Sequence, residues 1–144
     1  MDGNSIDVNK LNLQARQVFQ WINERYPHWS AYAEKRGRDD ISIVVPAPGR
    51  LSESLSILTD QGNYWVRFAP QYAWYGVNDK DELLTVVDEL VNDRLFIVVI
   101  MKGHEFIEVN LASPGSLPNL EPEETAQIIS WSGTHDEVLK GSLK

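Results

Sequence analysis

Apolar side chains recur every three or four positions in the first part of the chain, which is the spacing of one helix face. They are Leu11, Ala15, Val18, Phe19, Ile22, Tyr26 and Trp29. Pro27 disfavours helical backbone at the residue before it. The spacing therefore predicts a helix from Val8 to Tyr26 and a short second helix from Pro27 to about Lys35. A loop of cancelling charges follows, up to Asp40.

Three later segments are rich in β-branched residues or alternate apolar with polar side chains, which predicts strands. They are residues 41–45, 54–59 and 64–68. The turn residues Asp60–Asn63 join the last two segments as a hairpin. Alternation on the third segment places Tyr64, Val66 and Phe68 toward the core. The two side chains between them, Trp65 and Arg67, then lie on the opposite face.

Residues 69–78 are aromatic and interrupted by proline and glycine, so we expect a loop there. The segment Asp79–Glu82 resembles a capping box with an acid at the cap position, and it predicts a central helix that ends near Asn92. The acidic side chains of its first turn are favoured by the helix dipole. The buried stripe of this helix is expected at Leu83, Val87, Leu90 and Val91.

The remaining elements are predicted to be strands. Residues 94–101 are apolar on both faces, which is typical of a strand covered on both sides. Residues 105–111 alternate, residues 112–122 form a proline-containing loop, and residues 125–132 form a last strand before a polar tail that we expect to be mobile beyond Lys140. The chain is therefore predicted to be one α+β domain over residues 1–144. An antiparallel or mixed β-sheet of about five to six strands would carry the N-terminal and central helices.

Composition excludes several functional classes. The chain of 144 residues has no cysteine and a net charge of −8, and most of that charge lies after residue 60. The absence of cysteine excludes disulfides and thiolate chemistry. No signal-peptide pattern and no apolar run of membrane-spanning length are present, so we expect a cytoplasmic protein with no membrane partner. An acidic surface repels phosphate and favours a basic protein over nucleic acid as a partner, although it also serves solubility.

Candidate chemistry is sparse. The histidines His28, His104 and His135 are not spaced as a metal site. The run Gly133–Asp136 contains a hydroxyl, an imidazole and an acid, but neighbours in sequence point in different directions. Glu105 and Glu108 are three apart on a predicted strand and should face opposite sides, against a carboxylate pair. We therefore predict a protein that is not an enzyme and that uses no cofactor and no metal.

The best candidate site combines aromatic side chains with the acidic start of the central helix. Tyrosine, tryptophan and arginine are enriched at interface hot spots because they bury much area and keep a polar group. The proposed partner-binding residues are Trp65, Arg67, Tyr72, Trp74, Tyr75, Asp79, Asp81 and Glu82. The alternative is that the aromatic residues cover an edge of the core.

The arrangement of residues 51–111 resembles the small immunity proteins that bacteria encode beside polymorphic or contact-dependent toxins. The resemblance lies in the hairpin Leu55–Phe68, the capped helix Asp79–Asn92 and the apolar strand Leu95–Met101. It implies a non-catalytic protein that binds and neutralises a cognate, basic toxin. One alternative is a small acidic secretion or folding chaperone that dimerises and binds an extended client segment. Another is a small-molecule binder or an unrecognised enzyme. The sequence leaves the oligomeric state open.

Overall fold

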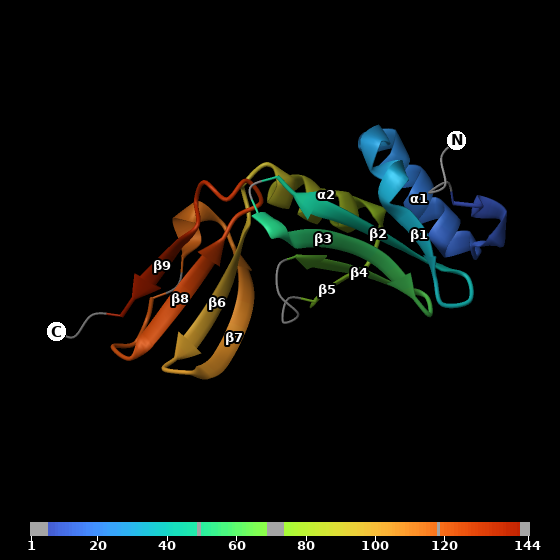
Figure 1. The fold of residues 1–144 in the computed structure, drawn as a ribbon. Coiled ribbons are helices and arrows are strands. Elements are labelled where there is room, and N and C mark those ends of the chain that lie inside the picture. The colour runs from blue at the N-terminus through green and yellow to red at the C-terminus, as the bar shows by residue number, and fades with distance from the viewer. Residues whose placement is uncertain (1–5, 49, 69–73, 118, 142–144) are drawn as a thin grey trace.

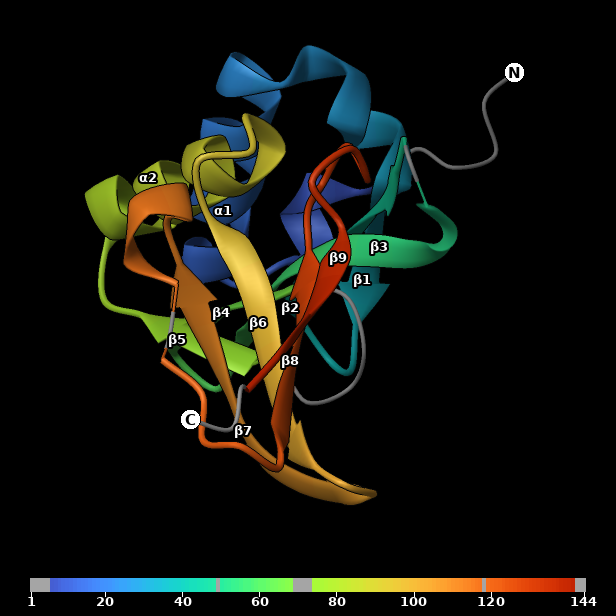
Figure 2. The ribbon, with the colours of Figure 1, turned by 90° about the vertical axis from the view of Figure 1, so that its left-hand side faces the viewer.

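The chain folds into two antiparallel sheets, and helices cover one face of the first (Figure 1). The structure is a computed structural model that describes residues 6–48, 50–68, 74–117 and 119–141. Sheet A is a meander of β1 (Ala33–Arg36), β2 (Asp40–Ala47), β3 (Arg50–Asp60), β4 (Asn63–Phe68) and β5 (Trp74–Val77), in that order across the sheet. Sheet B has the order β7 (Glu105–Ala112), β6 (Phe96–Lys102), β8 (Glu124–Ile129) and β9 (Glu137–Lys140), and Figure 2 shows these four strands side by side.

The first helix, α1 (Leu13–Arg25), begins and ends where local chemistry dictates. The side chain of Asn12 caps it by accepting a hydrogen bond from the backbone N–H of Ala15. The helix stops before Pro27, as predicted, and a 3₁₀ helix follows at Pro27–Tyr32. The predicted start at Val8 is wrong, because Val8–Lys10 forms a separate 3₁₀ turn that ends in extended backbone at Leu11. The apolar stripe of α1 is buried at Ala15, Val18 and Ile22.

The second helix, α2 (Lys80–Val91), is capped by Asp79 as predicted, but Glu82 bonds to the residue before the cap and not to the cap itself, so the capping box is incomplete. Asp79 Oδ1 accepts a hydrogen bond from Glu82 N at 2.9 Å, and Glu82 Oε1 accepts one from Asn78 N at 2.6 Å. The first bond satisfies an N–H group of the first helical turn that has no partner within the helix, and the second holds the residue before the cap. The buried stripe consists of Leu83, Val86, Val87 and Leu90, whereas Val91, which was predicted to belong to it, is half-buried.

Two apolar clusters hold the sheets in place. The larger cluster joins α1, α2 and one face of sheet A to Ile97, Val99 and Ile129 of sheet B and to Trp131, which follows β8. The smaller cluster lies on the other face of sheet B and contains Phe96, Val98, Ile100, Ala126 and Ile128. Leu117 and Leu120, which follow β7, pack against this second cluster. Strand β6 is therefore buried on both faces, as its unbroken apolar run predicted.

The α+β class, the N-terminal helix and the central helix are confirmed, but the strands form two sheets instead of the single sheet that was expected. Three segments were also predicted wrongly. Strand β1 includes residues assigned to a short helix, β5 lies in the segment assigned to a loop, and β9 lies in the polar tail. Each of these strands has four residues. So short a segment has too few positions for alternation to be visible, and a neighbouring strand decides its conformation.

Candidate protein-binding surface

The helices lie on one side of sheet A, and the other side forms what we call the open face (Figure 1). Strand register assigns the residues of the open face to two rows of cross-strand partners. One row is Ser42, Leu58, Trp65 and Gly76. The next row is Val44, Ser56 and Arg67, and it continues at the Cα of Trp74 on the edge strand β5.

Leu58 shows that the open face has an apolar centre. Its side chain is only 6% exposed, yet it belongs to neither of the two core clusters. Trp65 is the cross-strand neighbour of Leu58 on this face. The ring of Trp65 also lies against Gly76, where an added Cβ would stand 3.4 Å from Cζ3. The absence of a side chain at Gly76 therefore leaves space for the indole.

The rim of this apolar centre is accessible. Val44 is 44% exposed, and Pro46, two residues further along β2, is also exposed. Trp65 and Arg67 are half-buried. The prediction that these two side chains lie opposite to Val66 and to the rest of the core face is confirmed, because Val66 belongs to the main core and they do not. An aliphatic, an aromatic and a cationic side chain are thus presented together.

The other predicted aromatic residues are only partly described. Trp74 and Tyr75 lie on β5, where their Cα atoms pair with those of Arg67 and Val66. Tyr72 lies outside the described residues. The structure therefore brings the backbone of Trp74 beside Arg67, in an edge strand and not in the expected loop.

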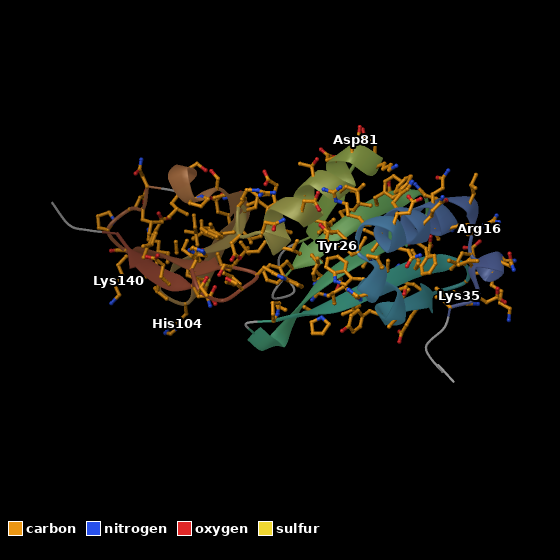
Figure 3. All side chains as sticks on the ribbon, turned by 90° about the horizontal axis from the view of Figure 1, so that it is seen from above. Arg16, Tyr26, Lys35, Asp81, His104 and Lys140 are labelled. Atoms are coloured by element: carbon orange, nitrogen blue, oxygen red, sulfur yellow. The ribbon has the colours of Figure 1, made fainter. Side chains whose placement is uncertain are left out.

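The acidic part of the predicted site lies on the helix side of sheet A. Asp79 and Glu82 are engaged in capping α2. The ammonium of Lys80 lies 5.9 Å from the ring centre of Trp21 on α1, which places this end of α2 in the helix layer. Asp81 is exposed and points outward from α2 (Figure 3). The predicted patch is thus divided: Trp65 and Arg67 are on one side of the sheet, and the three acids are on the other.

Asp40, a carboxylate with a lowered pKa, is part of the fold and lies away from Trp65 and Arg67. Partial burial acts to raise the pKa of Asp40, but hydrogen bonds donated by Thr59, Asn12 and the Gln61 backbone outweigh it, helped by the charge of Arg36. The bond from Thr59 Oγ1 is 2.8 Å long and the bond from Asn12 Nδ2 is 3.0 Å long. Asp40 therefore ties the start of α1 to the β3–β4 turn.

The hydroxyl, imidazole and acid near residue 133 form a structural turn. Ser130 is buried, and its Oγ donates a hydrogen bond to Asp136 Oδ1 at 3.0 Å. The same Oγ accepts a bond from the backbone N–H of His135 at 3.1 Å. The His135 ring lies near Asp93, with 3.9 Å between Nε2 and Oδ2. The hydroxyl of the predicted run, that of Thr134, shares a hydrogen bond with Ser132 Oγ at 2.7 Å, so the described contacts direct the imidazole at an acid and not at this hydroxyl.

A β-bulge corrects the expectation for Glu105 and Glu108. Glu108 pairs with Ile100, but Phe106 pairs with Met101, so Ile107 is an extra residue on β7. The extra residue shifts the alternation by one position. Glu105 and Glu108 consequently lie on the same face of sheet B, where opposite faces were predicted.

Among the described residues, no group of three or more His, Asp or Glu side chains could hold a metal ion.

Comparison with family models, curated proteins and solved structures finds no match to this chain. Within the described ranges, none of the helices is long and apolar enough to cross a membrane. Sequence reasoning missed Val44, Leu58 and Gly76 as parts of the open face. Leu58 had a detectable signal, because it is out of phase with the alternation of Leu55 and Ile57 on the same strand.

Proposed function

We propose that this chain is a non-catalytic protein-binding domain and that the open face of sheet A is its contact surface. The observation that carries the proposal is the exposed Val44 and the half-buried Trp65 and Arg67, which share the open face with Leu58, an apolar residue outside both core clusters. A half-buried tryptophan beside an arginine is the composition of an interface hot spot. Binding would bury Val44, Trp65 and Arg67, which the fold leaves partly exposed.

Within that class, we propose an immunity protein that neutralises a basic toxin domain. The net charge of −8 supports a basic partner, because complementary charge accelerates encounter and orients the two proteins. Asp81 is exposed at the start of α2 and would contribute to this field. Blocking a toxin needs only a stable contact surface, which agrees with the sparse candidate chemistry of the sequence.

A chaperone for an extended client segment is the second candidate. The observation that favours it is the edge strand β7, which runs over eight residues and carries exposed Phe106 and Ile107. A chaperone of this kind would bind several unrelated unfolded segments and would form a dimer. An inhibitor would bind one folded partner with a defined stoichiometry.

The test is co-expression of the chain with the protein encoded beside its gene, followed by calorimetric titration of the purified pair. We expect growth rescue and one tight complex. Trp65→Ala and Val44→Lys should each raise the Kd at least tenfold, which is about 1.4 kcal/mol. Asp81→Lys should slow association and reduce its dependence on salt. Circular dichroism of each variant should match that of the original chain.

The matched control is Gln20→Lys, which adds the same charge at an exposed position of α1. It should leave the Kd unchanged. If Gln20→Lys and Val44→Lys weaken binding equally, the net charge determines the affinity and the open face does not. Rescue without any effect of Trp65→Ala would remove the open face from the proposal, and saturable binding of many unfolded proteins would favour the chaperone.

A further inference from the structure

The outer edge of β7 differs from the other described sheet edges. Strands β1, β5 and β9 are edge strands of four residues each, whereas β7 is an edge strand of eight. Proteins protect sheet edges by keeping them short or charged, and β1 and β9 are both. The β7 edge is long, and its residues Phe106 and Ile107 are each 40% exposed.

The bulge at Ile107 gives the two faces of β7 different chemistry. Glu105 and Glu108 lie on one face, because their partners Lys102 and Ile100 are two residues apart on β6. Phe106 and Val109 lie on the other face, opposite Met101 and Val99. A strand added beside β7 would therefore meet carboxylates on one face and apolar side chains on the other.

The charges around this edge are mainly negative. On the face of sheet B that carries Glu105 and Glu108, Lys102 supplies a positive charge. It pairs with Glu105 on one neighbouring strand and with Glu124 on the other. Its ammonium is already 3.7 Å from a carboxylate oxygen of Glu123. Two copies of β7 paired antiparallel would place their glutamates on one face of a continuous sheet, and like charges there repel. A second copy of this chain is thus a poor occupant of the edge.

We propose that β7 binds an extended segment of a protein partner, by strand addition, in which basic residues alternate with apolar ones. The inference rests on the proposed protein-binding function and names the class of segment that a second surface would take. Backbone hydrogen bonds to the edge of β7 hold the added strand, and its alternate side chains select the sequence. Lysine or arginine side chains meet Glu105 and Glu108, while apolar side chains cover Phe106 and Val109.

The test uses the full chain labelled with ¹⁵N and a capped eight-residue peptide in which lysine alternates with valine. Titration followed by NMR should shift the amide signals of β7 and slow their hydrogen exchange. A peptide in which glutamate replaces each lysine should bind at least fivefold more weakly. Glu105→Gln combined with Glu108→Gln should raise the Kd of the lysine peptide about threefold to tenfold, the effect of two exposed charge pairs.

The matched control is Glu24→Gln combined with Glu34→Gln, which changes the net charge equally at exposed positions of α1 and β1. It should leave the Kd unchanged. Shifts confined to residues outside β7, equal binding of both peptides, or no binding would each overturn the proposal. A concentration-dependent dimer that Phe106→Lys abolishes would replace it with self-pairing. Val44→Lys should leave peptide binding intact. Failure of the proposal for the open face of sheet A can therefore be distinguished from failure of the proposal for β7.

Discussion

The ring centre of Phe68, the last residue of β4, lies 5.7 Å from the ring centre of Trp131, and the two ring planes are inclined by 50°. This contact joins sheet A to the residues that follow β8 in sheet B. Phe68 is 1% exposed and Trp131 is 9% exposed, and both belong to the same core cluster. The two sheets are therefore connected through shared aromatic packing as well as through the chain.

Truncation of Phe68 should destabilise both sheets together. Phe68→Ala should lower the free energy of unfolding by about 3–5 kcal/mol, since it leaves a cavity beside the Trp131 ring. Urea unfolding followed by far-ultraviolet circular dichroism and by tryptophan fluorescence should give coincident transitions, as one cooperative domain requires. Two separated transitions would mean that the sheets unfold independently. Val138→Ala serves as the control. Val138 lies on β9 and is 62% exposed, so this substitution should change the free energy of unfolding little.

Gly141 should tolerate no side chain. An added Cβ would stand 1.8 Å from the carbonyl oxygen of Glu121, while Gly141 N donates a hydrogen bond to Glu124 O at 2.9 Å. Gly141→Ala must therefore displace the end of β9 and should cost about 1–3 kcal/mol. Hydrogen exchange of the Gly141 amide should accelerate.

Gly115→Ala is the matched control for Gly141→Ala. No atom lies within 4 Å of a Cβ built on Gly115, and its φ is not positive. The substitution should alter the free energy of unfolding by less than about 0.5 kcal/mol. Equal stability of the two alanine variants would contradict the close approach at Glu121.

Asp40 should make the stability of the protein depend on pH in the acidic range. Its pKa is lower in the folded state than the ordinary value of 3.8, so the unfolded chain binds its proton more tightly. Its stabilising contribution is therefore complete above the unfolded pKa and is lost as the pH falls through the folded pKa. Asp40→Asn should cost about 1 kcal/mol near pH 7.

The measurement is urea unfolding of the original chain and of Asp40→Asn between pH 7 and pH 2.5. The difference in unfolding free energy should be constant down to about pH 5 and should shrink below about pH 4. Glu24→Gln, at an exposed position of α1, should show no comparable trend. A difference that grows as the pH falls would have the wrong sign for a lowered pKa.

The contact between α1 and α2 should depend more on Tyr26 than on Arg25. The carboxylate of Asp88 on α2 accepts hydrogen bonds from the hydroxyl of Tyr26 and from the guanidinium of Arg25. Tyr26 also stacks on Trp29, with 4.1 Å between ring centres, so its hydroxyl is held in place. Arg25 is exposed, and solvent weakens its ion pair.

Tyr26→Phe should therefore lower the free energy of unfolding by about 1 kcal/mol. Arg25→Ala should lower it by less than about 1 kcal/mol. A double-mutant cycle between Tyr26→Phe and Asp88→Asn should give a coupling of the same order as the single Tyr26 effect. Zero coupling would show that the hydroxyl and the carboxylate do not interact in solution.

The sequence by itself determined α1, apart from its start, and α2, and the faces of the longest apolar segments. Helix hydrogen bonds connect residues close in sequence, so the caps Asn12 and Asp79 and the apolar period define α1 and α2 locally. The buried run of β6 and the outward direction of Trp65 also followed from local alternation.

Only the tertiary structure decided the number of sheets, the short strands and the division of the candidate site. A strand acquires its hydrogen bonds from another segment, so β1, β5 and β9 exist because β2, β4 and β8 lie beside them. The bulge at Ile107, which places Glu105 and Glu108 on one face, depends on register with β6 in the same way. The separation of Trp65 from Asp81 follows from α2 packing against the inner face of sheet A, a choice made by the shared core and by no local pattern.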